Sequence, residues 1–138
     1  MPLRPLTPNF AVAPQIALDE TAAIAAAGYK AVVVNRPDHE DPGQPTMAEM
    51  RAAVEAAGMA FVEIPISSGQ FTPDAVDATR AAIDAHDGPI LAYCRSGTRS
   101  ATLWALAEAP RKGADAVIAA AAEGGYDLSP LRAHLARG

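Results

Sequence analysis

Four short apolar runs alternate with longer segments, and this alternation limits the possible folds more than any other feature of the sequence. The runs occupy residues 10–13, 31–34, 61–64 and 90–93. The segments between and after them carry the start and stop signals of helices. Strands that alternate with helices of ten or more residues predict βαβ units. We therefore expect an α/β fold with a mostly parallel central sheet flanked by helices.

Capping and breaking residues predict where the helices begin and end. Thr46 and Glu49 form a capping-box pattern for a helix over 47–57. Thr72 and Pro73 suit the first positions of a helix that reaches about residue 86. Further helices are predicted over 18–27, 99–107, 115–123 and, with Ser129 as its cap, 130–135. Prolines at positions 2, 5 and 8 exclude the first residues from any helix or central strand.

The length and the charge balance limit the kinds of function. A chain of 138 residues is the size of one domain, and we expect residues 1–138 to form a single domain. The net charge of −5 gives little support to a nucleic-acid or anionic-membrane partner. The first eight residues lack the apolar core of a signal peptide. No stretch approaches the roughly 20 apolar residues of a membrane span. The expected location is cytoplasmic, and the sequence does not indicate an oligomeric state.

The only cysteine, Cys94, follows the fourth apolar run and precedes a short polar stretch and a predicted helix. In a strand–loop–helix arrangement, successive backbone N–H groups point at one spot. The helix dipole and the nearby Arg95 and Arg99 favour the thiolate form of Cys94. A single cysteine excludes an intrachain disulfide and a multi-cysteine metal site. The sequence therefore predicts a nucleophile beside an anion-binding loop.

Each residue of this loop has a predicted role. Cys94 is the expected nucleophile, and Arg99 can donate two hydrogen bonds to an anionic substrate. Gly97 permits a positive φ and a close approach of the bound group to the backbone. The Ser100 hydroxyl can hydrogen-bond to the thiolate. The remaining residues expected to bind substrate, partly through backbone N–H groups, are Arg95, Ser96 and Thr98.

Ligands of parallel sheets bind beyond the carboxyl ends of the strands, so the loops 35–45, 65–71 and 94–99 should converge. In the first of these loops, the side chains that could shape the pocket are Asn35, Arg36 and Asp38. The alternative for them is a solvated turn with local hydrogen bonds.

The remaining polar and aromatic residues have simpler interpretations. His39, Glu40 and Asp41 could suggest a metal site, but they lack partners at ligand spacing, so a solvated acidic loop is expected, with no metal or cofactor. Near predicted helix C-termini, His86 and His134 suit the helix dipole. We expect the residues Tyr93 and Trp104 to pack in the interior. Tyr126 can reach the loop only if the C-terminal helices fold back.

The run 93–100, Tyr-Cys-Arg-Ser-Gly-Thr-Arg-Ser, resembles the Cys-Arg-x-Gly-x-Arg active-site loop of rhodanese-type sulfurtransferases. The layout of the chain resembles the dual-specificity protein tyrosine phosphatases, with residues 31–36 and 61–66 at the places of two characteristic strands. Both features combine in a bacterial family of beta-lactamase-hydrolase-like phosphatases or tyrosine-phosphatase-like sulfurtransferases. Segments 27–30, 88–93 and 125–128 also fit that family, so the resemblance covers nearly the whole chain.

Departures from the phosphatase pattern bear on the expected chemistry. Cysteine phosphatases carry His-Cys-x5-Arg, whereas here Tyr93 replaces the histidine and only four residues separate Cys94 from Arg99. Dual-specificity phosphatases place an aspartic acid where this chain has Ser67 and Ser68, and the nearby Asp74 belongs to the first turn of a predicted helix. These departures favour sulfur transfer, which needs no strong acid.

We therefore expect a sulfurtransferase that takes a sulfane sulfur from thiosulfate or a low-molecular-weight persulfide. A Cys94 persulfide would pass the sulfur to a thiol acceptor. One alternative is a phosphatase that hydrolyses a phosphate ester through a phosphoryl-cysteine on the same loop. Another is a non-catalytic anion-binding or redox-sensing module.

Overall fold

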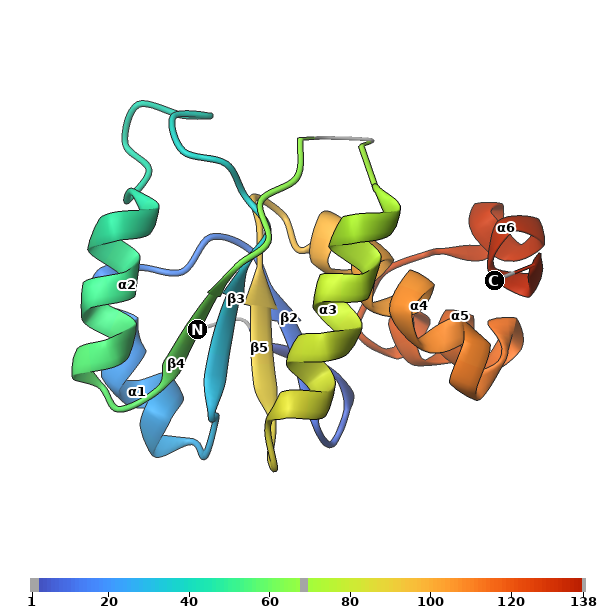
Figure 1. The fold of residues 1–138 in the computed structure, drawn as a ribbon, viewed down its shortest axis with the longest axis horizontal. Helices are drawn as coiled ribbons and strands as arrows, with labels where there is room; N and C mark the ends of the chain where they lie inside the picture. The colour runs from blue at the N-terminus through green and yellow to red at the C-terminus, as the bar shows by residue number, and fades with distance from the viewer. Residues whose placement is uncertain (1–2, 68–69, 138) are drawn as a thin grey trace.

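A five-stranded sheet with the order β1-β2-β5-β3-β4 forms the centre of the computed structural model, which describes residues 3–67 and 70–137 (Figure 1). Its strands are β1 (Arg4–Thr7), β2 (Phe10–Ala13), β3 (Ala31–Val34), β4 (Ala60–Glu63) and β5 (Ile90–Tyr93). Strands β2, β5, β3 and β4 are parallel to one another, and β1 is antiparallel to β2. The predicted α/β class with a mostly parallel sheet is confirmed.

The helices cover both faces of the sheet. They are the 3-10 turn η1 (Leu18–Glu20), α1 (Thr21–Ala26), α2 (Met47–Ala56), α3 (Pro73–Ala85), α4 (Thr98–Lys112), α5 (Ala114–Glu123), the 3-10 turn η2 (Ser129–Leu131) and α6 (Arg132–Arg137). In Figure 1, α1 and α2 lie on one side of the sheet and α3 to α6 on the other. None of the helices in the described ranges is both long and apolar enough to span a bilayer.

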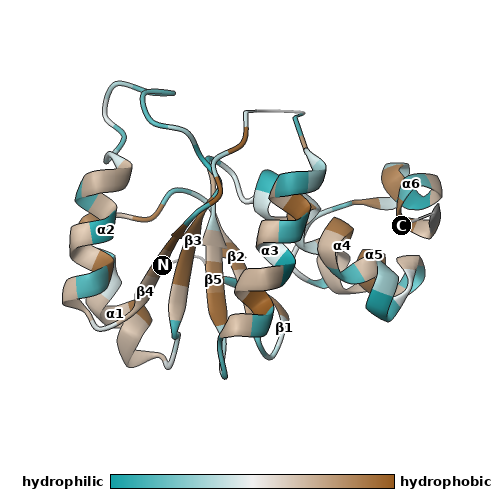
Figure 2. Cartoon of the chain, in the orientation of Figure 1, coloured by the Kyte–Doolittle hydropathy of each residue, from teal (hydrophilic) through white to brown (hydrophobic). Residues whose placement is uncertain are grey.

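Alternation along the strands divides the core between the two faces. Successive strand residues point to opposite sides of a sheet, and in β5 Leu91 and Tyr93 pack in the cluster that contains Met50 of α2. Ile90 and Ala92 of the same strand belong to the cluster around Trp104 of α4. In Figure 2, β3 and β5 are accordingly largely brown, whereas α2 and α3 also carry teal segments. Because β5 is covered on both faces, the chain that leaves it is firmly anchored.

Several predicted boundaries are confirmed and others are wrong. Thr46 and Glu49 form the predicted capping box of α2, and Thr72 caps α3. Strand β1 contains Pro5 and was not predicted, because an edge strand tolerates a residue that lacks an N–H. Helix α4 continues past residue 107 and includes Pro110, which lies close enough to the end to interrupt little of the hydrogen bonding.

The C-terminal helix also differs from its predicted form. Ser129 does not act as its cap, because the Ser129 hydroxyl donates to Asp127 Oδ1 at 2.6 Å. The segment begins as the turn η2 and continues as α6 to residue 137. The chain between α5 and η2 returns toward the carboxyl end of β5, which brings Tyr126 to the cysteine loop.

Candidate active site

Cys94 follows directly after β5, the strand between β2 and β3. Its side chain is fully buried, and its backbone N–H donates to Ala13 O at 3.3 Å. The chain then curls around the sulfur, so that Gly97 N–H donates to Cys94 Sγ at 3.0 Å. Gly97 has a φ of +96° and is the cap residue of α4. The predicted strand–loop–helix arrangement, with a positive φ at the glycine, is confirmed.

Tyr126 covers the loop from the C-terminal part of the chain. Its hydroxyl donates to Ser96 O at 3.2 Å. A Cβ atom on Gly97 would overlap the Tyr126 hydroxyl, so two independent constraints, conformation and space, require glycine at this position. The sequence predicts that Tyr126 reaches the loop only if the C-terminal helices fold back, and in the structure this segment does fold back onto the loop.

Arg99 lies in the first turn of α4, and its guanidinium is held by hydrogen bonds to two other loops. Its Nη1 and Nη2 atoms donate to the two carboxylate oxygens of Glu40, each at 2.8 Å, and Nη1 also donates to Ile66 O at 2.9 Å. These contacts join the loops 35–45, 65–71 and 94–99, whose predicted convergence is confirmed. The remaining N–H groups, on Nε and Nη2, form the side edge of the guanidinium. The pKa of Arg99 is raised first by Glu40 and also by Cys94, which therefore lies close by. This side edge of the guanidinium can donate two parallel hydrogen bonds to an oxyanion.

Glu40 is in turn held by a buried arginine. Arg36 donates through Nε to Glu40 at 2.9 Å and through Nη1 to Gln15 Oε1 at 3.0 Å, and it also pairs with Asp41. Hydrogen bonds from Arg99, reinforced by Arg36, lower the pKa of Glu40 below its usual range. The same contact with Glu40 raises the pKa of Arg99. Glu40 is exposed, as expected for an acidic loop, but its ion pairs with two arginines were not predicted.

The other candidates of the first loop lie behind the site. The Asn35 side chain is buried and donates to Ile64 O at 3.0 Å, which ties the ends of β3 and β4 together. Asp38 accepts a hydrogen bond from Met47 N at 2.7 Å, at the start of α2. Neither of these residues nor Arg36 lines the pocket described below. The alternative of a solvated turn with local hydrogen bonds is wrong for Asn35 and Arg36, because both are buried and bond to distant segments. Arg36 acts on the site through Glu40 and through Asp41, which also pairs with Arg95.

The remaining residues of the cysteine loop lie either at its exposed tip or at its buried base. At the tip, the Ser96 hydroxyl bonds to the Thr98 hydroxyl at 3.1 Å, and the exposed Arg95 lies 3.6 Å from Asp41 Oδ2. At the base, the Ser100 hydroxyl is fully buried and has no hydrogen-bond partner within the described ranges. The predicted bond between this hydroxyl and the sulfur is thus not formed in this state, although the hydroxyl has no other partner.

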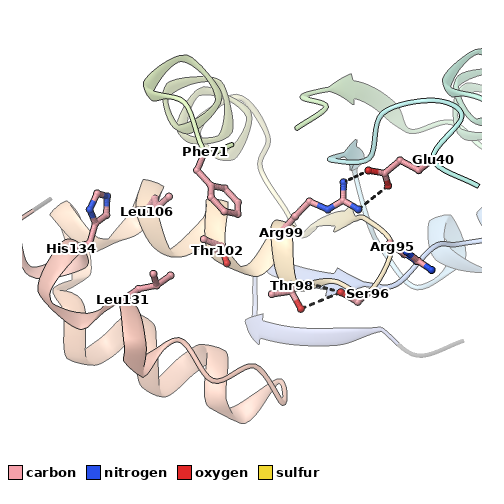
Figure 3. A pocket seen from close by; sticks show the side chains of 10 residues that line it. All are labelled: Glu40, Phe71, Arg95, Ser96, Thr98, Arg99, Thr102, Leu106, Leu131 and His134. Atoms are coloured by element: carbon pink, nitrogen blue, oxygen red, sulfur yellow. Dashed lines mark hydrogen bonds and ion pairs between the residues drawn. The ribbon is translucent and has the colours of Figure 1, made fainter. Parts of the chain in front are cut away.

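A pocket of about 800 Å3 opens beside Arg99 and extends along α4 (Figure 3). One end is polar and contains Glu40, Arg95, Ser96, Thr98 and Arg99. The other end is lined by Phe71, Thr102, Leu106, Leu131 and His134. In Figure 3, Phe71 and Leu131 face the pocket from opposite sides, and Glu40 points at the Arg99 guanidinium. The pocket thus joins an anion-binding end to an apolar wall.

Sequence reasoning missed several residues of this pocket. His134 was assigned to a helix dipole, but it lines the pocket from α6. Phe71 and Leu131 gave no signal beyond ordinary apolar residues, since only the folded chain places them opposite each other. An ion pair of Glu40 was predictable from the sequence, because a carboxylate in a loop near two arginines readily forms charge-assisted hydrogen bonds with them.

The positions at which a dual-specificity phosphatase places its acid carry none here. Ser67 is exposed, and Ser68 lies outside the described residues. Asp74 is exposed in the first turn of α3, as predicted. Tyr93, at the position of the phosphatase histidine, is buried in the sheet, and this burial raises its pKa.

Comparisons with known proteins identify relatives of this chain. A profile of the family "Beta-lactamase hydrolase-like protein, phosphatase-like domain" matches residues 2–114. A Beta-lactamase hydrolase-like protein of Agrobacterium fabrum is 35% identical over 101 residues, and one of Xylella fastidiosa is 34% identical over 122 residues. These alignments cover 73% and 87% of this chain but 23% and 28% of the relatives. The chain therefore spans about a quarter of the length of these curated relatives.

Solved structures show the same fold. A candidate phosphatase from Neisseria meningitidis Z2491 superposes with a TM-score of 0.86 at 31% identity, covering 99% of this chain and 98% of that one. TpbA of P. aeruginosa, solved in complex with pTyr, has a TM-score of 0.64 at 18% identity, with 99% and 91% covered. PTPMT1, solved in complex with PI(5)P, has a TM-score of 0.77 at 14% identity, with 99% and 94% covered. The last two show the fold alone, which is that of the dual-specificity and tyrosine phosphatases.

These findings correct the sulfurtransferase hypothesis, since the matching family and the similar structures are of the phosphatase kind. The hypothesis gave too much weight to loop length. A loop one residue shorter still wraps the sulfur with an N–H donor and still places an arginine at the start of the helix. The anion-binding features therefore do not depend on the missing residue. By its profile match and its relatives, the chain belongs to the family of beta-lactamase hydrolase-like proteins, as their phosphatase-like domain.

Proposed function

We propose that this chain is a cysteine-dependent phosphatase that hydrolyses phosphate monoesters through a phosphocysteine on Cys94. The observation that carries this proposal is the loop around Cys94 Sγ, which lies close to Arg99 and whose Ser96 lines the polar end of the pocket beside that arginine. The phosphatase-like family and the phosphate-ester ligands of TpbA and PTPMT1 support it.

In the first step, the Cys94 thiolate attacks the phosphorus of the bound ester. An S–P bond forms while the bond from phosphorus to the ester oxygen breaks, and the leaving group departs with that electron pair. The side edge of Arg99 binds two equatorial oxygens, and the positive end of α4 stabilises their charge. Gly97 N–H, which donates to the sulfur in the resting site, is available to a phosphoryl oxygen once the S–P bond has formed.

In the second step, a water molecule attacks the phosphocysteine. The S–P bond breaks, orthophosphate leaves, and the thiolate is regenerated. The Ser100 hydroxyl, buried and without a partner, can then donate to the sulfur as its negative charge returns. A hydrogen-bond donor that binds only the negatively charged sulfur stabilises the thiolate as a leaving group.

Among the described residues that line the pocket, no carboxylic acid is available to protonate the leaving group. Glu40 is the carboxylate nearest to Arg99, but its lowered pKa keeps it ionised at neutral pH and unable to donate a proton. Ser67 is not an acid at neutral pH either. We therefore infer that preferred substrates have weakly basic leaving groups, such as phenols, which can take their proton from solvent.

The apolar end of the pocket supports the same class of substrate. Phe71, Leu106 and Leu131 offer a wall against which an aromatic ring can pack, next to the anion-binding end. An aryl phosphate places its charge and its ring at these two ends. Phosphate esters of strongly hydrated alcohols gain nothing from this wall.

A hydrolysis assay with p-nitrophenyl phosphate tests the proposal. Wild-type protein should release nitrophenol, and Cys94→Ser should abolish turnover. Rapid acid quenching should trap an adduct of about +80 Da on Cys94, the mass of one phosphoryl group in a covalent intermediate. Across substituted phenyl phosphates, kcat/KM should fall steeply as the phenol becomes more basic.

Two outcomes would contradict the proposal. Turnover that persists in Cys94→Ser would show that another group performs the chemistry. Rapid alkylation of Cys94 by iodoacetamide without turnover of any phosphate ester would instead favour the non-catalytic anion-binding or redox-sensing module.

A further inference from the structure

The peptide unit between Ser96 and Gly97 is held from both sides. Its carbonyl oxygen accepts a hydrogen bond from the Tyr126 hydroxyl at 3.2 Å. Its N–H donates to Cys94 Sγ at 3.0 Å. The peptide is trans, so the carbonyl and the N–H point in opposite directions from one rigid plane. A hydrogen bond at the carbonyl therefore fixes the direction of the N–H.

The opposite orientation of this peptide would harm the site. A rotated plane would turn the Ser96 carbonyl toward the sulfur, where its partial negative charge repels a thiolate and a phosphate alike. Gly97, at a φ of +96°, is the residue type that permits such a rotation at low cost. The local sequence thus leaves the orientation of the peptide open, and a contact from elsewhere must set it.

Tyr126 is well placed to set it. The residue is 9% exposed, and its own N–H donates to Ala121 O at 2.9 Å. The Arg4 guanidinium lies 5.9 Å from the centre of the ring and donates to Gly124 O at 3.1 Å. Burial raises the pKa of Tyr126, so its hydroxyl keeps the proton that it donates. The ring is anchored by β1 and α5, not by the loop that it contacts.

We propose that Tyr126 is a positioning residue for the reaction. Its hydroxyl holds the Ser96–Gly97 peptide with the N–H directed at the sulfur and, after the first step, at the phosphoryl group bonded to that sulfur. The role rests on the proposed phosphatase function. Tyr126 lies outside residues 2–114, the range that matches the family profile. The C-terminal segment thereby controls the geometry of a loop about 30 positions earlier.

The substitution Tyr126→Phe tests this role, because it removes the hydroxyl and keeps the ring. Tyr29→Phe is the matched control, since Tyr29 is also partly buried and packs against the core cluster on the other face of the sheet. Two readouts apply to both variants. The first is kcat and KM for p-nitrophenyl phosphate. The second is the hydrogen-exchange rate of the Gly97 amide by NMR.

In Tyr126→Phe, kcat should fall about tenfold or more while KM changes less than about threefold, in line with the loss of one buried hydrogen bond that orients a charged site. The Gly97 amide should exchange about tenfold faster, because its bond to sulfur is no longer enforced. Tyr29→Phe should leave both quantities within about twofold of wild type, as expected for a residue away from the site.

Three results would overturn the proposal. They are unchanged Gly97 exchange in Tyr126→Phe, equal acceleration in Tyr29→Phe, and a loss confined to KM. The exchange measurement needs no substrate. If wild-type protein hydrolyses no phosphate ester, the phosphatase function fails, while accelerated exchange in Tyr126→Phe would still establish that Tyr126 orients the peptide.

Discussion

The contact between Glu40 and Arg99 offers the sharpest test of how the anion-binding end is built. Glu40 accepts hydrogen bonds from Nη1 and Nη2 at the end of the Arg99 guanidinium and does not occupy its side edge. The carboxylate should therefore orient the arginine for substrate and should not compete with substrate. In Glu40→Gln the shape is retained, but only one oxygen can accept, and the amide NH2 faces guanidinium N–H groups that repel it. We expect lower activity, not higher.

The magnitude follows from the contacts. Charge-assisted hydrogen bonds contribute about 1.5–3 kcal/mol when well buried. The Glu40 side chain is 24% exposed and Arg99 11% exposed, so solvent screening reduces this value. Ile66 O still holds Nη1 in the variant. A loss of about 1–2 kcal/mol is expected, which corresponds to a roughly 5- to 30-fold fall in kcat/KM.

Steady-state hydrolysis of p-nitrophenyl phosphate and inhibition by orthophosphate measure this effect. Both kcat/KM and phosphate affinity should fall in Glu40→Gln. Asp84→Asn is the matched control, because Asp84 accepts two hydrogen bonds from Arg111 at 2.8 and 2.7 Å on α3, away from the pocket. If Glu40→Gln is as active as Asp84→Asn, or more active than wild type, Glu40 does not orient Arg99 as argued.

The pH dependence supplies a second check. The pKa of Glu40 is lowered in the folded protein, so its interaction with the arginines is fully present above the ordinary pKa of a glutamate. It is lost only as the pH falls through the lowered value. The ratio of phosphate affinities of wild type and Glu40→Gln should therefore stay constant from about pH 8 down to the ordinary pKa of a glutamate, about 4.3, and shrink only at lower pH, as the native carboxylate becomes protonated.

Three other substitutions test separate parts of the structure. Gly97→Ala should lower the free energy of unfolding by about 1–3 kcal/mol, because alanine is strained at the positive φ of this position. It should also lower kcat, because the added Cβ displaces the Tyr126 hydroxyl. Unchanged urea denaturation and unchanged activity would contradict this prediction. Leu131→Ala should raise KM for p-nitrophenyl phosphate about three- to tenfold with kcat unchanged, because it removes part of the apolar wall. Asn35→Ala should destabilise the fold by about 1–3 kcal/mol, measured by urea denaturation, because Ile64 O is left without its buried donor.

Local signals in the sequence were sufficient where one segment determines its own structure. The β-branched run of β3 and the capping pairs of α2 and α3 predicted those elements within a residue or two. Cys94 and Gly97 were recognisable because the strand, the glycine and the helix start are adjacent in the chain. The convergence of three loops was also predictable, since it follows from parallel strands alone.

Contacts between distant segments could not be predicted in the same way. Nothing near Tyr126 indicates that its hydroxyl meets Ser96, because this depends on how α5 turns back over the sheet. His134 reaches the pocket only through the placement of α6. The expected sulfur chemistry failed for a related reason. A count of loop residues is local, whereas the anion site is completed by Glu40, Ile66 and Tyr126 from other parts of the chain.

The site therefore has two parts with different origins along the chain. The proposed nucleophile Cys94, the loop N–H and Arg99 with its partner Glu40 all lie within the matched residues 2–114. Tyr126, Leu131 and His134 lie beyond them and supply the contact that orients the loop and the far wall of the pocket. We expect the chemistry to depend on the first part and substrate choice on both parts, because the apolar wall combines Phe71 and Leu106 of the first part with Leu131 of the second. Relatives that keep the cysteine loop but differ after α4 should share the reaction and differ in their substrates.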